Sequence, residues 1–104
     1  MLKGLIAGLA MCATAGVALA EPADGRKVAQ AQCAQCHDIG VGPAVSGRQG
    51  PSFADIAKMP STTELSLKVF LRSSHRNMPN LILTADEVDA LAAWILELGG
   101  KGHS

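Results

Sequence analysis

The sequence lacks an excess of charge of either sign, since its 104 residues carry nine Lys or Arg and nine Asp or Glu. This balance excludes the strongly basic profile of nucleic-acid-binding proteins and the profile of a highly acidic surface. The sequence also lacks internal repeats, low-complexity tracts and any linker long enough to divide it. We therefore expect one domain after the N-terminal segment.

Long hydrophobic runs are absent except at the beginning of the chain. Lys3 gives a positive start, residues 5–19 are apolar and small, and Ala18-Leu19-Ala20 has the pattern that signal peptidase cleaves. The run is too short and too rich in Ala and Gly for a typical membrane anchor of about 20 strongly apolar residues. We predict that residues 1–20 are a signal peptide and that residues 21–104 form the exported domain, without stable membrane insertion after cleavage.

Cysteine is scarce in the rest of the chain. After the leader, the cysteines are Cys33 and Cys36. A disulfide between them would close a very small loop and would restrain the unfolded chain little. A domain of this size has a small core and commonly needs disulfides, a metal or another built-in cofactor for stability. We therefore expect that the domain needs a bound metal or cofactor for stability.

No segment alternates convincingly as a strand, and helical patterns recur, so the expected fold class is all-α with long irregular loops. The expected helices cover approximately residues 24–33, 52–58, 61–73 and 84–98. The expected N-terminal signals are Asp24, Ser52, a Ser61/Glu64 capping box and a Thr84/Glu87 capping box. In the last segment, one apolar stripe must be buried, and it comprises Val88, Leu91, Ala92, Ile95 and Leu98, with Trp94 beside it.

The stretch "CAQCHDIG" places Cys33, Cys36 and His37 within five positions. A structural zinc site needs four Cys or His ligands, and this cluster offers at most three. A thioredoxin-like dithiol begins a helix, whereas Cys33 is expected to end one. In C-x-x-C-H the two thiols can bond to haem vinyl groups, and the imidazole can bind the iron. We predict one haem attached to Cys33 and Cys36, with His37 as an axial ligand.

The second axial ligand must come from elsewhere in the chain. Outside the leader the methionines are Met59 and Met78, and each precedes a proline. Met78 lies between the third and fourth expected helices, where a rigid Met-Pro turn can bring its sulfur to the far side of the haem. Met59 is better interpreted as a core or cap-packing residue. We favour Met78, with His75 and Met59 as alternatives.

These residues together resemble the short class I bacterial cytochromes c. The similarity covers nearly all of residues 21–104, through "CAQCH", "GPSFADIA", "NMPN" and "LAAWILEL". It implies the cytochrome c fold, with about four short helices and irregular loops wrapped around one covalently attached haem c. It also implies that the first and last helices cross near Gly25, with Trp94 at the aromatic position of the last helix.

The resemblance further implies a Gly-Pro whose proline carbonyl accepts a hydrogen bond from the ligand histidine and orients its ring. The chain has two candidates, Gly42-Pro43 and Gly50-Pro51. Because "GPSFADIA" supplies the aromatic residue and short helix expected afterwards, we favour Pro51 over Pro43. Its separation from His37 is longer than is usual in the short members of the family.

Ligation by histidine and methionine would fill both axial positions and leave no open site for a substrate. We therefore expect a non-enzymatic, monomeric one-electron carrier in the periplasm, acting between a donor and an acceptor protein. One alternative is a haem-bearing electron-transfer subunit of a larger dehydrogenase or oxidase complex. A haem ligand sensor or a small peroxidase is the other, if Met78 dissociates easily.

The charges are unevenly distributed along the chain. Residues 48–76 contain five basic and two acidic residues, while the last expected helix has four acids and no base. The basic residues are Arg48, Lys58, Lys68, Arg72 and Arg76. We expect this segment to face an acidic redox partner, with the acidic helix pointing away. A solvated surface of mixed charge is the alternative.

Overall fold

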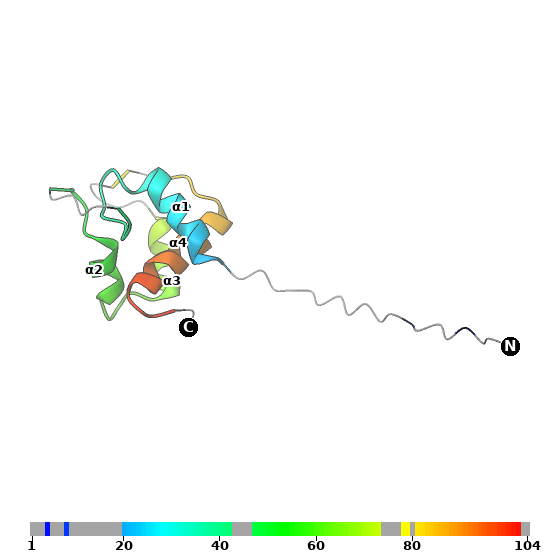
Figure 1. Cartoon of the computed structure of the whole chain (residues 1–104). Helices are drawn as coiled ribbons and strands as arrows, with labels where there is room; N and C mark the ends of the chain where they lie inside the picture. The colour runs from blue at the N-terminus through cyan, green and yellow to red at the C-terminus, as the bar shows by residue number, and fades with distance from the viewer. Residues whose placement is uncertain are drawn as a thin grey trace.

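The computed structural model describes residues 20–42, 47–73, 78–79 and 81–102, together with Gly4 and Gly8. Within these residues the regular secondary structure consists of four α-helices and no β-strand (Figure 1). The helices are α1 (Pro22–Gln32), α2 (Phe53–Lys58), α3 (Glu64–Leu71) and α4 (Ala85–Leu98). The predicted all-α class is confirmed. No helix in the described part of the chain is long and apolar enough to cross a membrane.

Helix α4 begins as the sequence predicts. The hydroxyl of Thr84 accepts a hydrogen bond from the backbone N–H of Glu87 at 3.1 Å, and the Glu87 carboxylate accepts one from the backbone N–H of Thr84 at 2.9 Å. This capping box satisfies donors that the first turn would otherwise leave unpaired. Gly99 is the C-cap. Four residues of the predicted stripe are buried, namely Val88, Leu91, Ala92 and Ile95.

Helix α2 also begins as predicted, whereas α1 does not. The Ser52 hydroxyl accepts a hydrogen bond from the backbone N–H of Asp55 at the start of α2. Helix α1 starts at Pro22, after Glu21, and Asp24 lies within its first turn rather than at its N-cap. Proline suits the first helical position because its φ angle is already helical and it has no N–H to leave unpaired. The prediction of Asp24 as the N-cap was therefore wrong.

The N-cap of helix α3 lies two residues later than the sequence suggested. Its N-cap is Thr63, whose hydroxyl accepts from the N–H of Ser66, while the Ser66 hydroxyl accepts from the N–H of Thr63. The Ser61/Glu64 box was wrong because a second hydroxyl, at Ser66, completes the box from Thr63. Only Leu67 of this helix is buried, and Leu65 is 71% exposed.

Helices α1 and α4 cross at a very close contact. Gly25 is buried there, and a Cβ atom at this position would overlap the backbone carbonyl oxygen of Ala90. The same Cβ would lie 2.8 Å from Cβ of Trp94. The two backbones approach this closely because glycine has no side chain, which is the crossing that the resemblance implied.

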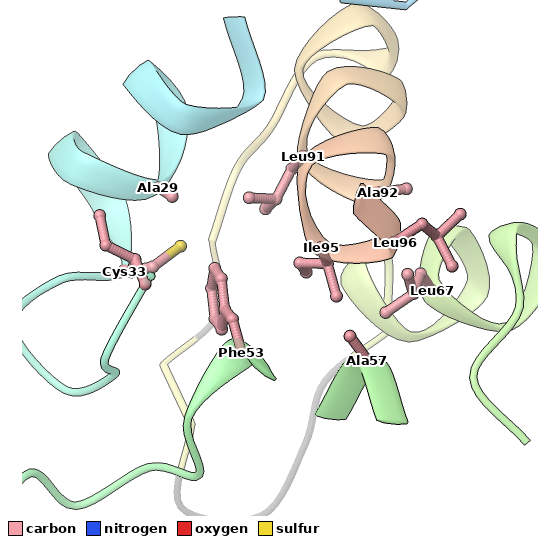
Figure 2. Packing of buried hydrophobic residues seen from close by; sticks show 10 residues of the cluster. Ala29, Cys33, Phe53, Ala57, Leu67, Leu91, Ala92, Ile95 and Leu96 are labelled. Atoms are coloured by element: carbon pink, nitrogen blue, oxygen red, sulfur yellow. The ribbon is translucent and has the colours of Figure 1, made fainter. Parts of the chain in front are cut away.

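The core lies between α1, α2 and α4, with α3 packed beside α4. Figure 2 shows Ala29 and Cys33 on one side, Phe53 of α2 between, and Leu91 and Ile95 of α4 on the other. Leu67 of α3 reaches the same cluster next to Leu96. The first cysteine of the C-x-x-C-H motif is therefore part of the core.

The chain beyond α4 is tied to the connection between α2 and α3. The Lys101 ammonium donates hydrogen bonds of 2.8 Å to the backbone carbonyls of Met59 and Thr62. Thr62 is buried, and its hydroxyl donates to the carbonyl of Ile56 in α2. Met59 is the C-cap of α2 and its side chain is half exposed, so it belongs to the helix end and not to the core.

Candidate haem site

The C-x-x-C-H motif forms a tight turn that continues directly from α1. The N–H groups of Cys36 and His37 both donate to the carbonyl of Cys33, at 3.1 and 3.0 Å, and the N–H of Cys33 donates to Ala29. Cys33 is 5% exposed, while Cys36 and His37 are half-buried. The turn brings both thiols and the imidazole to the end of α1, next to the core.

The two cysteines of the motif, Cys33 and Cys36, are free, and burial raises the pKa of the Cys33 thiol to about 11. A thiol of this pKa is almost wholly protonated near neutral pH, whereas dithiol redox motifs use a cysteine of lowered pKa at a helix N-terminus. Cys33 instead follows the C-terminal end of α1. Across the described residues, moreover, no three His, Cys, Asp or Glu side chains group as metal ligands. The raised pKa of Cys33 and its position after the end of α1 disfavour the dithiol alternative.

The imidazole of His37 is oriented by the second Gly-Pro of the chain. Its Nδ1 lies 2.7 Å from the carbonyl oxygen of Pro51, 14 residues further along. A carbonyl oxygen can only accept, so Nδ1 carries a proton, and in the neutral imidazole Nε2 therefore keeps its lone pair. A histidine fixed in this tautomer is prepared to bind a metal through Nε2. Pro43, the alternative partner, lies outside the described residues.

The loop that carries Pro51 is fastened to the motif by further hydrogen bonds. The N–H of Gly50 donates to the carbonyl of Cys36 at 2.7 Å, and the N–H of Phe53 donates to the carbonyl of Asp38 at 2.9 Å. The ring of Phe53 lies 5.3 Å from that of His37, at an interplanar angle of 43°. The imidazole is therefore held by a backbone carbonyl and an aromatic side chain from the same loop and helix.

Gly50 packs so closely on the imidazole that no side chain fits there. A Cβ atom at this position would overlap the His37 ring and would lie 2.8 Å from its Nε2. We expect Gly50→Ala to lower the free energy of unfolding of the haem-loaded protein by about 1–3 kcal/mol, because either the ring or the loop must move. Guanidinium unfolding would measure this, with Gln49→Ala, at an exposed neighbouring position, as the control. Equal stability of the two variants would contradict the packing.

Trp94 connects the last helix to the segment that follows the motif. Its indole N–H donates a hydrogen bond of 2.9 Å to the backbone carbonyl of Ile39, which is itself buried. The aromatic position of α4 therefore supplies both packing area and a donor for a carbonyl near His37. The apolar pattern of the last helix predicts packing at Trp94 but not this hydrogen bond.

Met78 lies between α3 and α4, as the sequence predicts, and is half-buried. The segment before it, including His75, lies outside the described residues. The structure therefore places Met78 in the connection from which the second ligand was expected, and its role as a ligand stays a prediction.

The basic segment expected to form a docking face is less exposed than its sequence suggested. Arg48 is half-buried, and its Nη1 donates to the carbonyl of His37 at 2.8 Å. Lys68 lies 2.7 Å from a Glu64 oxygen and 3.3 Å from an Asp89 oxygen. The hydrogen bond to Glu64, followed by that to Asp89, raises the pKa of Lys68. The charge of Lys68 is therefore balanced by carboxylates of its own helix and of α4.

Comparison with known proteins identifies the family. A family model described as cytochrome c oxidase, cbb3-type, subunit III matches residues 20–95. The chain is 36% identical over 95 residues to cytochrome c-552 of Bradyrhizobium diazoefficiens, covering 90% of this chain and 91% of that protein. The chain belongs to the cytochrome c family. No solved structure matches it.

Membership of the cytochrome c family confirms the predicted family and fold and implies a covalently bound haem c. The residues of this chain fit such a group. Cys33 and Cys36 are free thiols separated by two residues within one turn, and a neutral His37 that donates from Nδ1 has its Nε2 lone pair available. Proteins of this family are electron carriers with redox partners, and they are typically not enzymes.

Proposed function

We propose that this cytochrome c is a periplasmic one-electron carrier whose single haem c is bonded to Cys33 and Cys36 and ligated by His37 and Met78. The observation that carries the proposal is the 2.7 Å contact between Nδ1 of His37 and the carbonyl of Pro51. This contact fixes the tautomer that a ligand histidine needs, and it gives Pro51 its role as the orienting partner. Export would follow from cleavage of residues 1–20 as a signal peptide.

When bound, haem c supplies an iron that gains or loses one electron without making or breaking bonds to a substrate. The chain keeps the ligand geometry constant during this exchange. Pro51 and Phe53 hold the imidazole from one side, and the turn from Cys33 to His37 fixes its backbone. Burial of Cys33 among apolar side chains keeps water away from that edge of the site. A site of this rigidity favours electron transfer because little has to move.

The test is the absorption spectrum of the purified protein. A c-type pyridine haemochrome is expected from bonds to both Cys33 and Cys36, and a far-red sulfur-to-iron band is expected in the oxidised form. Cys36→Ala should give a haemochrome with one unsaturated vinyl group. A wild-type protein without a covalent haemochrome would reject the proposal.

A second candidate function is that of an electron-transfer subunit in a larger oxidase. The matching family model supports it, since its description names subunit III of a cbb3-type oxidase. The two functions differ in the state of the native protein. A free carrier elutes as a monomer from extracts and is oxidised by added soluble partners, whereas a subunit elutes with its complex. Ready binding of carbon monoxide to the reduced protein would instead favour a ligand sensor or a small peroxidase.

If the basic segment is the docking face for an acidic partner, its exposed positive charges among the described residues are Lys58 and Arg72. Arg48 and Lys68 are engaged within the protein, and Arg76 lies outside the described residues. A face with few free charges steers partners weakly, so electron transfer should depend only modestly on salt.

A further inference from the structure

The guanidinium of Arg48 lies against the backbone of the proposed axial ligand. Its Nη1 donates a hydrogen bond of 2.8 Å to the carbonyl of His37, and the residue is half-buried. Surface arginines usually keep the charged head in water and bury only the aliphatic stem. Here the charged head itself turns inward, toward the residue that would bind the iron.

Within the described part of the chain, no carboxylate pairs with this guanidinium. The ion pairs there join Lys68 to Glu64 and to Asp89. The acid next to His37 is Asp38, and its carboxylate accepts the N–H of Gly40. Among the described residues the charge of Arg48 therefore has no ionic partner, and the side chain is half-buried beside the site.

An unpaired, partly buried positive charge opposes the appearance of a second one nearby, and solvent screens it less than it screens an exposed charge. Loss of an electron from the site adds one positive charge. The reduced state should therefore be favoured by the presence of Arg48, without any contact between Arg48 and the partner proteins.

We propose that Arg48 sets the reduction potential of this site, raising it through the positive charge that it places at the His37 carbonyl. The inference rests on the proposed function, because it needs a haem iron held by His37. It assigns to Arg48 a role inside the protein in place of the docking role suggested by the sequence.

The test compares haem-loaded variants by spectroelectrochemical titration. Arg48→Gln removes the charge but keeps an N–H donor for the carbonyl, and Arg48→Lys keeps the charge. At the wild-type midpoint, we expect Arg48→Gln to lower the ratio of reduced to oxidised protein by about three- to tenfold, and Arg48→Lys to change it by less than about twofold. The control is Arg72→Gln, which removes an exposed positive charge at the end of α3.

The salt dependence of the effect also distinguishes Arg48 from the exposed control residue Arg72. In about 0.5 M salt, where the screening length is only ~4 Å, the small effect of Arg72→Gln should disappear while that of Arg48→Gln persists. An unchanged ratio in Arg48→Gln would overturn the proposal. So would a ratio in Arg48→Lys as low as in Arg48→Gln, or a salt dependence equal to that of the control.

A further variant leaves the arginine in place, for use if Arg48→Gln does not take up haem. Gln49→Glu puts a carboxylate beside Arg48 at an exposed position and should also lower the ratio, whereas no change would count against the proposal. Failure of the proposed function would be visible in the wild type, as the absence of a covalent haemochrome or of a reversible couple. An intact wild-type couple with unresponsive variants would reject the role of Arg48 alone.

Discussion

Replacement of Met78 by alanine is expected to abolish the far-red sulfur-to-iron band of the oxidised protein and to lower its reduction potential. A thioether is a neutral, soft ligand that favours reduced iron, so water or a nitrogen ligand in its place stabilises the oxidised state. Axial ligands set haem potentials over a range of about 0.8 V, and a fall of more than ~100 mV is expected. Optical spectra and a redox titration of the haem-loaded protein would measure both effects.

The matched control is Met59→Ala, since Met59 also precedes a proline. Its side chain is half exposed at the C-cap of α2, where it has no expected role at the iron. The band and the potential should both survive this change. If Met59→Ala removes the band and Met78→Ala keeps it, the ligand assignment is wrong. If the oxidised wild type itself shows no such band, the second ligand is not a thioether, and a nitrogen ligand such as His75 is indicated.

Substitution of Gly25 should have the largest effect on stability. A Cβ atom there would overlap the Ala90 carbonyl, so even Gly25→Ala must push α1 and α4 apart. We expect a loss of about 3 kcal/mol in the free energy of unfolding, at the upper end of overpacking effects because the obstacle is backbone. Gly25→Val should lose more or fail to fold. Guanidinium unfolding of the haem-loaded protein, followed by far-UV circular dichroism, provides the measurement.

Ala31→Val is the control for this series, because Ala31 lies in the same helix and is exposed. Valine there costs only its lower helix propensity, at most about 0.7 kcal/mol. Equal losses for Gly25→Val and Ala31→Val would show that the crossing tolerates a side chain, contrary to the contact described.

The N-terminal ends of two helices could be predicted from the sequence because a cap depends only on residues that are neighbours along the chain. The Thr84/Glu87 capping box and the Ser52 cap both occur as predicted, since each needs only a short polar side chain immediately before the helix and, for the box, a partner three residues later. Errors arose where two residues of similar chemistry compete. Ser61 and Thr63 both precede α3, and a reciprocal hydroxyl at Ser66 decides in favour of Thr63.

The contacts that shape the candidate site could be predicted only in part. The resemblance indicated Pro51, and the structure places its carbonyl at hydrogen-bond distance from Nδ1 of His37. The inward turn of Arg48 and the two hydrogen bonds of Lys101 had no signal in spacing or pattern. Long basic side chains reach many places, and their partners are backbone carbonyls that every residue possesses. Such contacts follow from the tertiary arrangement alone.

The crossing of α1 and α4 also determines when, during synthesis and folding, the core around Cys33 can close. It joins Gly25 to Ala90, near opposite ends of the domain, so the core around Cys33 closes only after the last helix has been synthesised. In the folded chain the Cys33 thiol is 5% exposed and its pKa is raised to about 11, which leaves it inaccessible and unreactive. If the proposed haem is bonded to Cys33, we therefore expect that bond to form before α4 docks and closes the core around this cysteine.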